Sequence, residues 1–286
     1  MSMVGALWRS THPGPSVVVT AVATLLGVAV GLPPWRLIVL GVAVLLGQLS
    51  VGLSNDAIDA RRDREAGRTD KPLARGEASV RSAWNASAVT VAVALALSAA
   101  LGGWMLVAHA ILLASAWSYN VGLKSTPISV VPFIVSFGLL PSLATLSAVD
   151  PRPAALWAGA AGGVIGIAIH LTNVLPDFED DARTGVRGLP HRIGRRASAV
   201  IAAIALALGA LVVLVGSTLG APTGGGGTAS PTVFAWVVFA LAVGLAAAGL
   251  ALALVRPPGR GVFRLVMLAA LMLCVQLAAT GQSIAA

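Results

Sequence analysis

The feature that most constrains this chain is a succession of long apolar segments separated by short polar loops. Nine segments are long and apolar enough to span a bilayer as helices, at residues 16–32, 35–54, 80–101, 103–123, 127–148, 153–175, 197–219, 232–255 and 262–284. The chain has 286 residues and is 10% charged, whereas a soluble domain carries about 25% charged residues. The sequence therefore predicts an all-α, polytopic integral membrane protein with nine transmembrane helices.

The basic character of the chain, with a sequence pI of about 11.4, raises the question of nucleic-acid binding. The charges lie in short loops between apolar segments, and this distribution argues against a nucleic-acid partner. If the N-terminus is cytoplasmic, every Lys and Arg except Arg36 and Arg152 lies on the cytoplasmic side, and Asp150 is the one acid outside. The positive-inside rule predicts this orientation, with the C-terminus outside. The preference for Arg over Lys hints at a bacterial plasma membrane.

The polar stretch after the second apolar segment carries oxygen-bearing side chains in a regular pattern. Asn55, Asp59 and Asp63 are spaced four residues apart, so on a helix they lie on one face and rise by about 6 Å per step. Placing such a row at the mouth of a membrane helix costs free energy unless a cation binds to it. Oxygen-only ligands favour a hard ion such as Mg²⁺. Downstream, Arg68 and Lys71 are suited to binding phosphate oxygens.

The same pattern occurs a second time in Asn173, Asp177 and Asp181, at an offset of 118 residues. This offset also aligns identical residues elsewhere, namely Leu53 with Leu171, Gly67 with Gly185, Pro72 with Pro190, and Gly76 with Gly194. Two rows in register predict an internal repeat and one composite site. We expect a single domain over residues 1–286. Its repeated halves are expected at about 16–123 and 127–255, with cytoplasmic motif loops at 55–81 and 177–196.

Two carboxylate rows that face each other across a cavity are suited to binding two divalent ions. Such ions neutralise a diphosphate and stabilise it as a leaving group. Fixed positive charge from Arg68, Lys71 and Lys124 would add to this effect. A low-dielectric cavity strengthens the electrostatic interactions and keeps water from a carbocation. The pattern therefore favours a substrate with a polar head and a long apolar tail.

The same residues resemble the UbiA superfamily of intramembrane prenyltransferases. The segment NDAIDARRD at 55–63 is similar to the NDxxDxxxD motif of that family, and NVLPDFEDD at 173–181 looks like its second motif, usually DxxxDxxxD. The segment RTDKPLARG at 68–76 resembles the basic-Pro-Leu stretch that follows the first motif. Tyr119 and Lys124, within SYNVGLKSTP, look like the family's Tyr–Lys pair.

The resemblance implies nine helices in two related bundles around a central cavity, with a cytoplasmic cap. It implies Mg²⁺-dependent ionisation of an isoprenyl diphosphate, followed by attack of a lipophilic acceptor such as an aromatic ring. The implied ligands of the metal ions, two in number, are Asn55, Asp59, Asp63, Asn173, Asp177 and Asp181. The implied diphosphate contacts are Asn55, Arg68, Lys71, Lys124 and Asn173. The implied catalytic residues are Asp59, Asp63, Asp177, Asp181 and Tyr119, the last facing the cation through its ring.

The chain departs from the family pattern at three positions. Asn173 stands where relatives often have Asp, which lowers the negative charge of the second row. Pro176 interrupts that row and is expected to kink its helix. Leu189 occupies the position in the second repeat that corresponds to Lys71 in the first.

Two other functions remain open from the sequence. A terpene cyclase of the same fold, in which the cation closes on its own chain, would use the same motifs. A transporter would place its ionisable residues near the membrane midplane, whereas the acids here lie at segment ends. The acids outside the two rows are expected to belong to solvated, self-paired loops, namely Asp56, Glu65, Asp70, Glu77, Glu179 and Asp180. The roles of four polar residues within apolar segments are left open, namely Gln48, His109, His170 and Gln276.

Overall fold

The computed structural model describes residues 2–219, 230–256, 259–280 and 284–285. Across these residues the regular structure is helical and contains no β-strand, which confirms the all-α prediction. The helices are α1 (Met3–Ser10), α2 (Pro13–Ala29), α3 (Pro34–Glu65), α4 (Val80–Leu101), α5 (Gly103–Val121), α6 (Val131–Thr145), α7 (Leu156–Asn173), α8 (Phe178–Arg183), α9 (Leu189–Ile193), α10 (Arg195–Leu219), α11 (Val233–Val255) and α12 (Arg260–Thr280). Two short 3-10 turns are η1 (Leu123–Ser125) and η2 (Leu175–Asp177).

The long helices account for the predicted apolar segments. Each segment overlaps one helix of the set α2 to α7 and α10 to α12. In the described part of the chain, seven helices are long and apolar enough to cross a membrane. Helix α6 is shorter, with 15 residues, and α1 and α2 reach the required length only as a pair bent by 61°. The chain is an integral membrane protein, while nine crossings and two bundles remain predictions.

The structure differs from the prediction at the start of the first polar loop, expected at 55–81. Helix α3 continues without interruption to Glu65. Ion pairs at helical spacing stabilise this polar extension, with Arg61 bonded to Glu65 at 2.8 Å and Arg62 to Asp59 at 2.9 Å. The first oxygen row therefore lies on a helix that begins among apolar residues and ends in the charged region.

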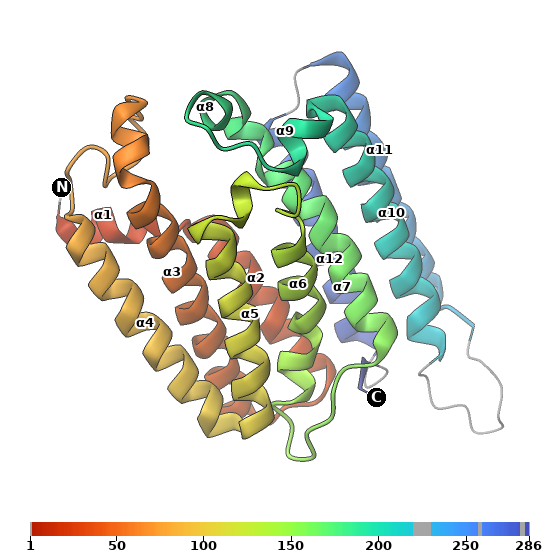
Figure 1. The fold of residues 1–286 in the computed structure, drawn as a ribbon. Coiled ribbons are helices and arrows are strands. Elements are labelled where there is room, and N and C mark those ends of the chain that lie inside the picture. Colours follow the sequence, from red (N-terminus) through yellow and green to blue (C-terminus); the bar gives the residue numbers. More distant parts are fainter. Residues whose placement is uncertain (1, 220–229, 257–258, 281–283, 286) are drawn as a thin grey trace.

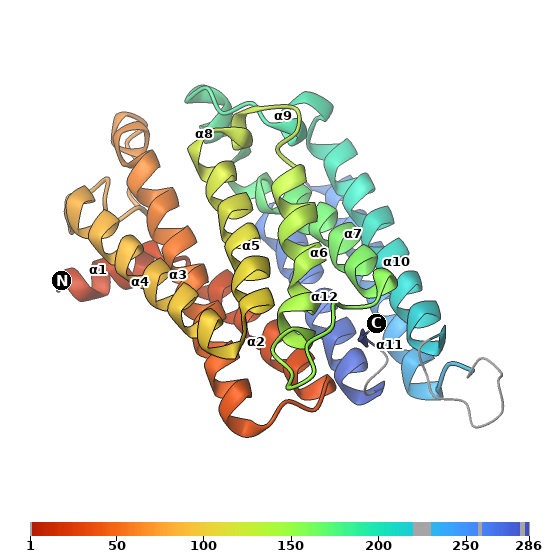
Figure 2. The same ribbon diagram turned by 60° about the horizontal axis from the view of Figure 1, so that its bottom comes forward.

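The helices close around a central space. Helix α3 packs against α2 and α4, α7 packs between α6 and α10, and a contact between α12 and α2 completes the ring. Figures 1 and 2 show α8, α9 and the end of α3 at one end of the bundle. The loops that join α2 to α3, α4 to α5 and α6 to α7 lie at the opposite end (Figure 1). The two predicted motifs therefore reach the same end of the bundle.

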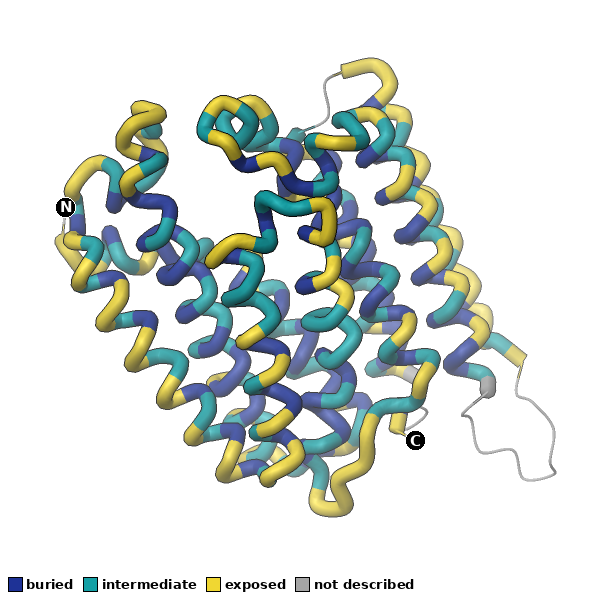
Figure 3. Tube along the Cα trace, viewed as in Figure 1, coloured by how far each residue is buried: buried dark blue, intermediate teal, exposed yellow. Residues whose placement is uncertain are grey.

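The outer surface of the bundle is strongly apolar. Figure 3 shows exposed residues along the outward faces of the helices. Large side chains on these faces include Val89, Trp104 and Leu254, with 63%, 68% and 58% of their surface exposed. A continuous apolar surface of this kind is rare on soluble monomers. It is the surface that a helix bundle presents to lipid.

Small residues determine how closely α6 and α7 pack. A Cβ atom on Gly162 would clash with the carbonyl oxygen of Phe137, and one on Gly166 would lie 2.6 Å from the carbonyl oxygen of Phe133. Glycines allow membrane helices to approach in this way because no side chain separates the backbones. The contact fixes the position of the two phenylalanines, which line the cavity described below.

We expect Gly162→Ala to lower the free energy of unfolding by about 1–3 kcal/mol, because the added methyl group overpacks the helix contact. Gly244→Ala is the matched control, since no atom lies within 4 Å of a Cβ added there. Both substitutions gain the same helix propensity, so their difference isolates the clash. Thermal unfolding in detergent micelles measures it, and equal melting temperatures for the two variants would contradict the packing.

Candidate active site

The first oxygen row occupies the last turns of α3. Asp59 and Asp63 are buried there, with 7% and 5% of their surface exposed. The helix then ends in a Schellman turn, in which the N–H of Arg68 donates to the carbonyl oxygen of Asp63 at 2.9 Å. Gly67 has a φ of 68° in this turn, a conformation that glycine adopts without strain. The turn returns the chain toward the row, and Arg68 lines the same cavity as the two carboxylates.

The second row is interrupted where the sequence predicts. Helix α7 ends at Asn173, Pro176 lies in the turn η2, and the chain resumes helical structure in α8. Helix α8 ends in the same type of turn as α3, since the N–H of Val186 donates to the carbonyl oxygen of Asp181 at 2.8 Å and Gly185 has a φ of 86°. These positions are offset by 118 from those of the first turn. The local repeat therefore extends to backbone geometry, while the larger halves remain a prediction.

A cavity of about 290 Å³ lies where the two rows meet. All ten predicted site residues line it, namely Asn55, Asp59, Asp63, Arg68, Lys71, Tyr119, Lys124, Asn173, Asp177 and Asp181. The remaining wall includes many apolar side chains from α5, α6, α7 and α12, among them Leu112, Phe133, Phe137, Leu140, Ile169, Phe263 and Met267. The cavity therefore joins a charged end to an apolar interior.

Cationic side chains compensate the charge of Asp59. Lys124, in η1 after α5, donates to both of its carboxylate oxygens at 2.5 and 2.7 Å. Arg62 lies 2.9 Å from the same carboxylate and 3.7 Å from that of Asp181 in the second row. Arg62 therefore links the two rows, and the carboxylates of Asp59 and Asp181 are near neighbours in the cavity. Two cations on one buried carboxylate offset its cost of desolvation.

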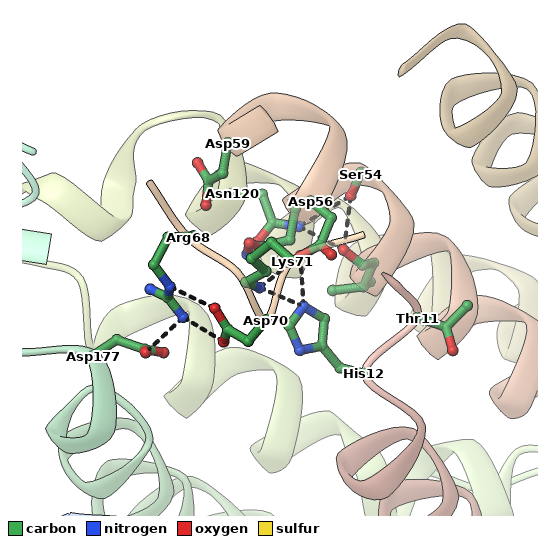
Figure 4. Close-up of polar contacts among 12 residues, drawn as sticks. Thr11, His12, Ser54, Asp56, Asp59, Arg68, Asp70, Lys71, Asn120 and Asp177 are labelled. Atoms are coloured by element: carbon green, nitrogen blue, oxygen red, sulfur yellow. Dashed lines mark hydrogen bonds and ion pairs between the residues drawn. The ribbon is translucent and has the colours of Figure 1, made fainter. Parts of the chain in front are cut away.

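Arg68 makes a second link between the rows. Its Nη2 donates to Asp177 at 3.0 Å, while Nε and Nη2 donate to the two oxygens of Asp70 at 2.8 Å each (Figure 4). The hydrogen bonds from Arg68 hold the pKa of Asp70 at about 2. The Arg68 side chain is only 12% exposed. Bonding from two directions fixes the guanidinium plane at the cavity wall.

Aromatic rings form the wall beside the charged end. Tyr119 packs edge-to-face against Phe133, with 5.2 Å between ring centroids, and against His170 at 5.8 Å. Tyr119 and Phe133 both line the cavity. His170 is fully buried, and its Nε2 lies 3.0 Å from the hydroxyl of Ser129. His170 therefore supports the ring of Tyr119 by packing.

The side-chain oxygens of the two rows are of the kind that binds a magnesium ion. Asp63 is buried, and in the described residues its carboxylate makes no hydrogen bond or ion pair. No group of three His, Cys, Asp or Glu residues in the described ranges is arranged to hold a metal ion. Magnesium does not require such a cage, because it is usually bound by one or two carboxylates together with substrate phosphates and water. The donor set therefore suits a metal that binds with a phosphorylated substrate.

The cavity residues that the sequence analysis missed include His12, Arg62 and Asn120. Arg62 lies within the first motif, so its helical spacing from Asp59 was a usable signal. Asn120 follows Tyr119 and donates to the carbonyl oxygen of Val51 at 2.9 Å, which ties α5 to α3. His12 precedes every apolar segment, and no periodic pattern marks it.

The prediction of a solvated loop is wrong for Asp56, which is 2% exposed. Its Oδ1 accepts hydrogen bonds from Lys71 at 2.8 Å and from His12 at 2.9 Å. Burial alone would lower the pKa of Lys71, but the attraction and hydrogen bond of Asp56 raise it overall. The expectation holds for Glu65 and Glu179, which are exposed and paired with arginines.

The polar residues left open by the sequence separate into two kinds. Gln48 lines the cavity and lies on the same face of α3 as Asn55. His109 is buried with its Nδ1 2.7 Å from the hydroxyl of Ser98. Gln276 is also buried, and its amide has no hydrogen-bond partner among the described residues. His109 and Gln276 therefore belong to the packing of the helices.

A helical membrane bundle with two aspartate-containing rows at one end of a cavity is the arrangement that the sequence motifs predict for an intramembrane prenyltransferase. The sequence profile of the UbiA prenyltransferase family matches residues 16–260. The chain belongs to this family, as its motifs predict.

Individual relatives are similar over part of the chain. Digeranylgeranylglyceryl phosphate synthase of Pyrococcus horikoshii is 28% identical over 184 residues, which cover 61% of this chain and 63% of the relative. The 4-hydroxybenzoate octaprenyltransferase of an Enterobacter species is 27% identical over 191 residues, 66% of each chain. The chain thus spans slightly less than two thirds of the length of these curated relatives.

Solved structures resemble the whole fold. A UbiA homolog from Archaeoglobus fulgidus bound to GPP and Mg²⁺ superposes with a TM-score of 0.74 and 15% identity, over 96% of this chain and 98% of the other. The apo structure of a UbiA homolog from Aeropyrum pernix K1 gives a TM-score of 0.71 and 19% identity, over 96% of both chains. At this level of identity the likeness concerns the fold.

We expect Lys124→Met to lower the free energy of unfolding by about 2 kcal/mol, because it removes a cation from a buried carboxylate that Arg62 still contacts. The double variant Asp59→Asn with Lys124→Met removes both partners and is expected to be more stable than Lys124→Met alone. Thermal unfolding in detergent measures both variants and Asp59→Asn. Simple addition of the two single effects would contradict a buried ion pair at this position.

Proposed function

We propose that this chain is a Mg²⁺-dependent intramembrane prenyltransferase, which transfers the prenyl group of an isoprenyl diphosphate to a lipophilic acceptor. The observation that carries the proposal is the single cavity lined by both oxygen rows, by Arg68, Lys71 and Lys124, and by an aromatic and aliphatic wall. Its charged end matches a diphosphate head. Its apolar interior matches an isoprenoid tail and shields it from water.

The relatives support this reaction class. The names of two relatives refer to prenyl groups. One is a 4-hydroxybenzoate octaprenyltransferase, and the other is a digeranylgeranylglyceryl phosphate synthase. A structure of the same fold is bound to GPP and Mg²⁺. The acceptor and the length of the prenyl chain follow from none of these names, because the relatives differ from one another in both.

The oxygen rows are the proposed site of two Mg²⁺ ions. The residues that would hold them are Asn55, Asp59, Asp63, Asn173, Asp177 and Asp181. When bound, the ions supply positive charge that neutralises the diphosphate and stabilises it as a leaving group. Asn173 is the most exposed member of its row, at the end of α7. An amide there in place of a carboxylate reduces the negative charge that faces the incoming diphosphate.

The basic residues are proposed to exchange partners when substrate binds. Lys124 contacts Asp59, and Arg68 contacts Asp177. Phosphate oxygens offer the same two cations stronger, multidentate acceptors, and this exchange releases the carboxylates toward the bound substrate. The bond between the allylic carbon and the diphosphate oxygen then breaks, with its electron pair leaving on the diphosphate. In this proposal the ring of Tyr119 stabilises the allylic cation until the acceptor attacks.

The charged end of the bundle is proposed to lie in the cytoplasm of a bacterium. The exposed arginines of the motif region, among them Arg61, Arg64 and Arg75, gather at this end. The positive-inside rule places such residues on the cytoplasmic side. The N-terminus and both motif regions would then be cytoplasmic, with the C-terminus outside the plasma membrane.

We expect Asp59→Ala and Asp177→Ala each to reduce release of diphosphate from an isoprenyl diphosphate by about 100-fold or more, because each removes a charged ligand. The measurement is a pyrophosphate-release assay on purified protein in detergent. Asp150→Ala is the matched control, because that carboxylate is 78% exposed and, within the described part of the chain, forms an ion pair with Arg152 alone. Full activity in either row variant, with a folded protein, would refute the assignment of the rows.

We expect chelation of divalent ions to abolish diphosphate release and Mg²⁺ to restore it more fully than Ca²⁺, because a compact octahedral ion suits two carboxylates and phosphates. The same assay with product analysis separates the alternative reactions. A cyclic hydrocarbon or alcohol formed without any acceptor would indicate a terpene cyclase. A protein that binds substrate but releases no diphosphate under any of these conditions would contradict an enzyme and favour a transporter.

A further inference from the structure

The N-terminal elbow between α1 and α2 reaches the cavity from outside the region that matches the family. The match begins at residue 16, whereas Thr11 and His12 precede it and both line the cavity. The two helices meet there at an angle of 61°. The elbow therefore forms a wall of the site that precedes the matched region in the sequence.

The elbow is held directly against α3. A Cβ atom on Gly52 would clash with the carbonyl group of Thr11, so the backbone of the elbow touches the backbone of α3. The same carbonyl oxygen accepts a hydrogen bond from the hydroxyl of Ser16 at 2.8 Å. Gly52 and Asp56 are four residues apart, so they share one face of α3. An elbow that packs on Gly52 consequently lies within reach of Asp56.

His12 bonds to Asp56 from a strained backbone conformation. Its φ of 52° is the one positive value for a residue other than glycine in the described part of the chain. This conformation costs an L-residue roughly 1–2 kcal/mol, so surrounding contacts must maintain it. Its Nε2 donates to Asp56 Oδ1 at 2.9 Å and lies 3.5 Å from Lys71 Nζ. The side chain lines the cavity and is 42% exposed.

Asp56 connects His12 to a cation of the proposed diphosphate site. The same Oδ1 accepts a hydrogen bond from Lys71 Nζ at 2.8 Å (Figure 4). The carboxylate is 2% exposed, so these bonds, rather than water, determine its orientation. A carboxylate that is fixed by one partner fixes the position of the other.

We infer that His12 is a positioning residue, which orients Asp56 and together with it holds the Lys71 ammonium group at the cavity wall for a diphosphate. The inference rests on the proposed function, since that function gives Lys71 its ligand. The first helix is then part of the binding site. Its residues Met3, Val4 and Trp8 are exposed, and such an apolar face suits contact with a membrane surface.

The test uses two substitutions of His12 in the full-length protein. His12→Asn keeps a residue that tolerates positive φ but is too short to reach Asp56, and His12→Gln offers an amide N–H near the position of Nε2. We expect His12→Asn to weaken binding of geranyl diphosphate in the presence of Mg²⁺ by about five- to tenfold, the usual net effect of losing one hydrogen bond. His12→Gln is expected to restore most of the affinity. Isothermal titration measures both.

Two further variants separate positioning from a structural effect. In a Lys71→Ala background, His12→Asn is expected to have no additional effect, because its action passes through Lys71. Glu77→Gln is the control for the elbow, since Glu77 pairs with Arg9 of α1 without contacting Lys71, and it is expected to bind geranyl diphosphate as the unsubstituted chain does.

Two outcomes would overturn the inference alone, provided that the unsubstituted chain binds geranyl diphosphate. One is unchanged affinity in His12→Asn, and the other is a loss that adds fully to that of Lys71→Ala. An unsubstituted chain that binds no geranyl diphosphate would instead contradict the proposed function, and the role of His12 with it.

Discussion

Carboxylates buried at the end of a membrane helix bundle remain charged only where cations lie close to them. Asp59 and Asp56 on α3 meet this condition through side chains from other segments, Lys124 of η1 for the first and Lys71 for the second. Each ion pair therefore fixes a loop against α3. The turn after α5 and the loop after α3 are arranged around the carboxylates in this way, and the cavity is formed between them.

The two oxygen rows lie on different local structures. In the first, α3 runs unbroken to Glu65, so its oxygen row is straight and its aspartates are buried. In the second, Pro176 ends α7 and moves Asp177 and Asp181 onto a turn and a short helix. These side chains remain 40% and 20% exposed. The first row is therefore buried and paired with cations, whereas the second row is accessible. This difference suits a diphosphate head that enters from the charged end of the cavity.

The sequence was sufficient for an all-helical membrane fold and for the six residues of the two oxygen rows, because long apolar runs and a four-residue spacing are local signals. Tyr119 was predicted only from the family resemblance. The sequence was insufficient for Asp56, which lies in a charged stretch but faces His12 and Lys71 in the interior. The helical extension of α3 was missed for a similar reason, since its composition matches that of a loop. Pairings such as Lys124 with Asp59 join residues 65 positions apart. Only the packing of helices brings such residues together.

We propose that both oxygen rows close on one diphosphate while the cations exchange carboxylate for phosphate. The decisive experiment is a structure of the complex with Mg²⁺ and a thiolo analogue of geranyl diphosphate. We expect the diphosphate between Asp59 and Asp177, with Lys124 Nζ moved from Asp59 to a phosphate oxygen and the tail among Phe133 and Phe137. A diphosphate bound outside this cavity, or an intact Lys124–Asp59 bond beside the bound ligand, would contradict it.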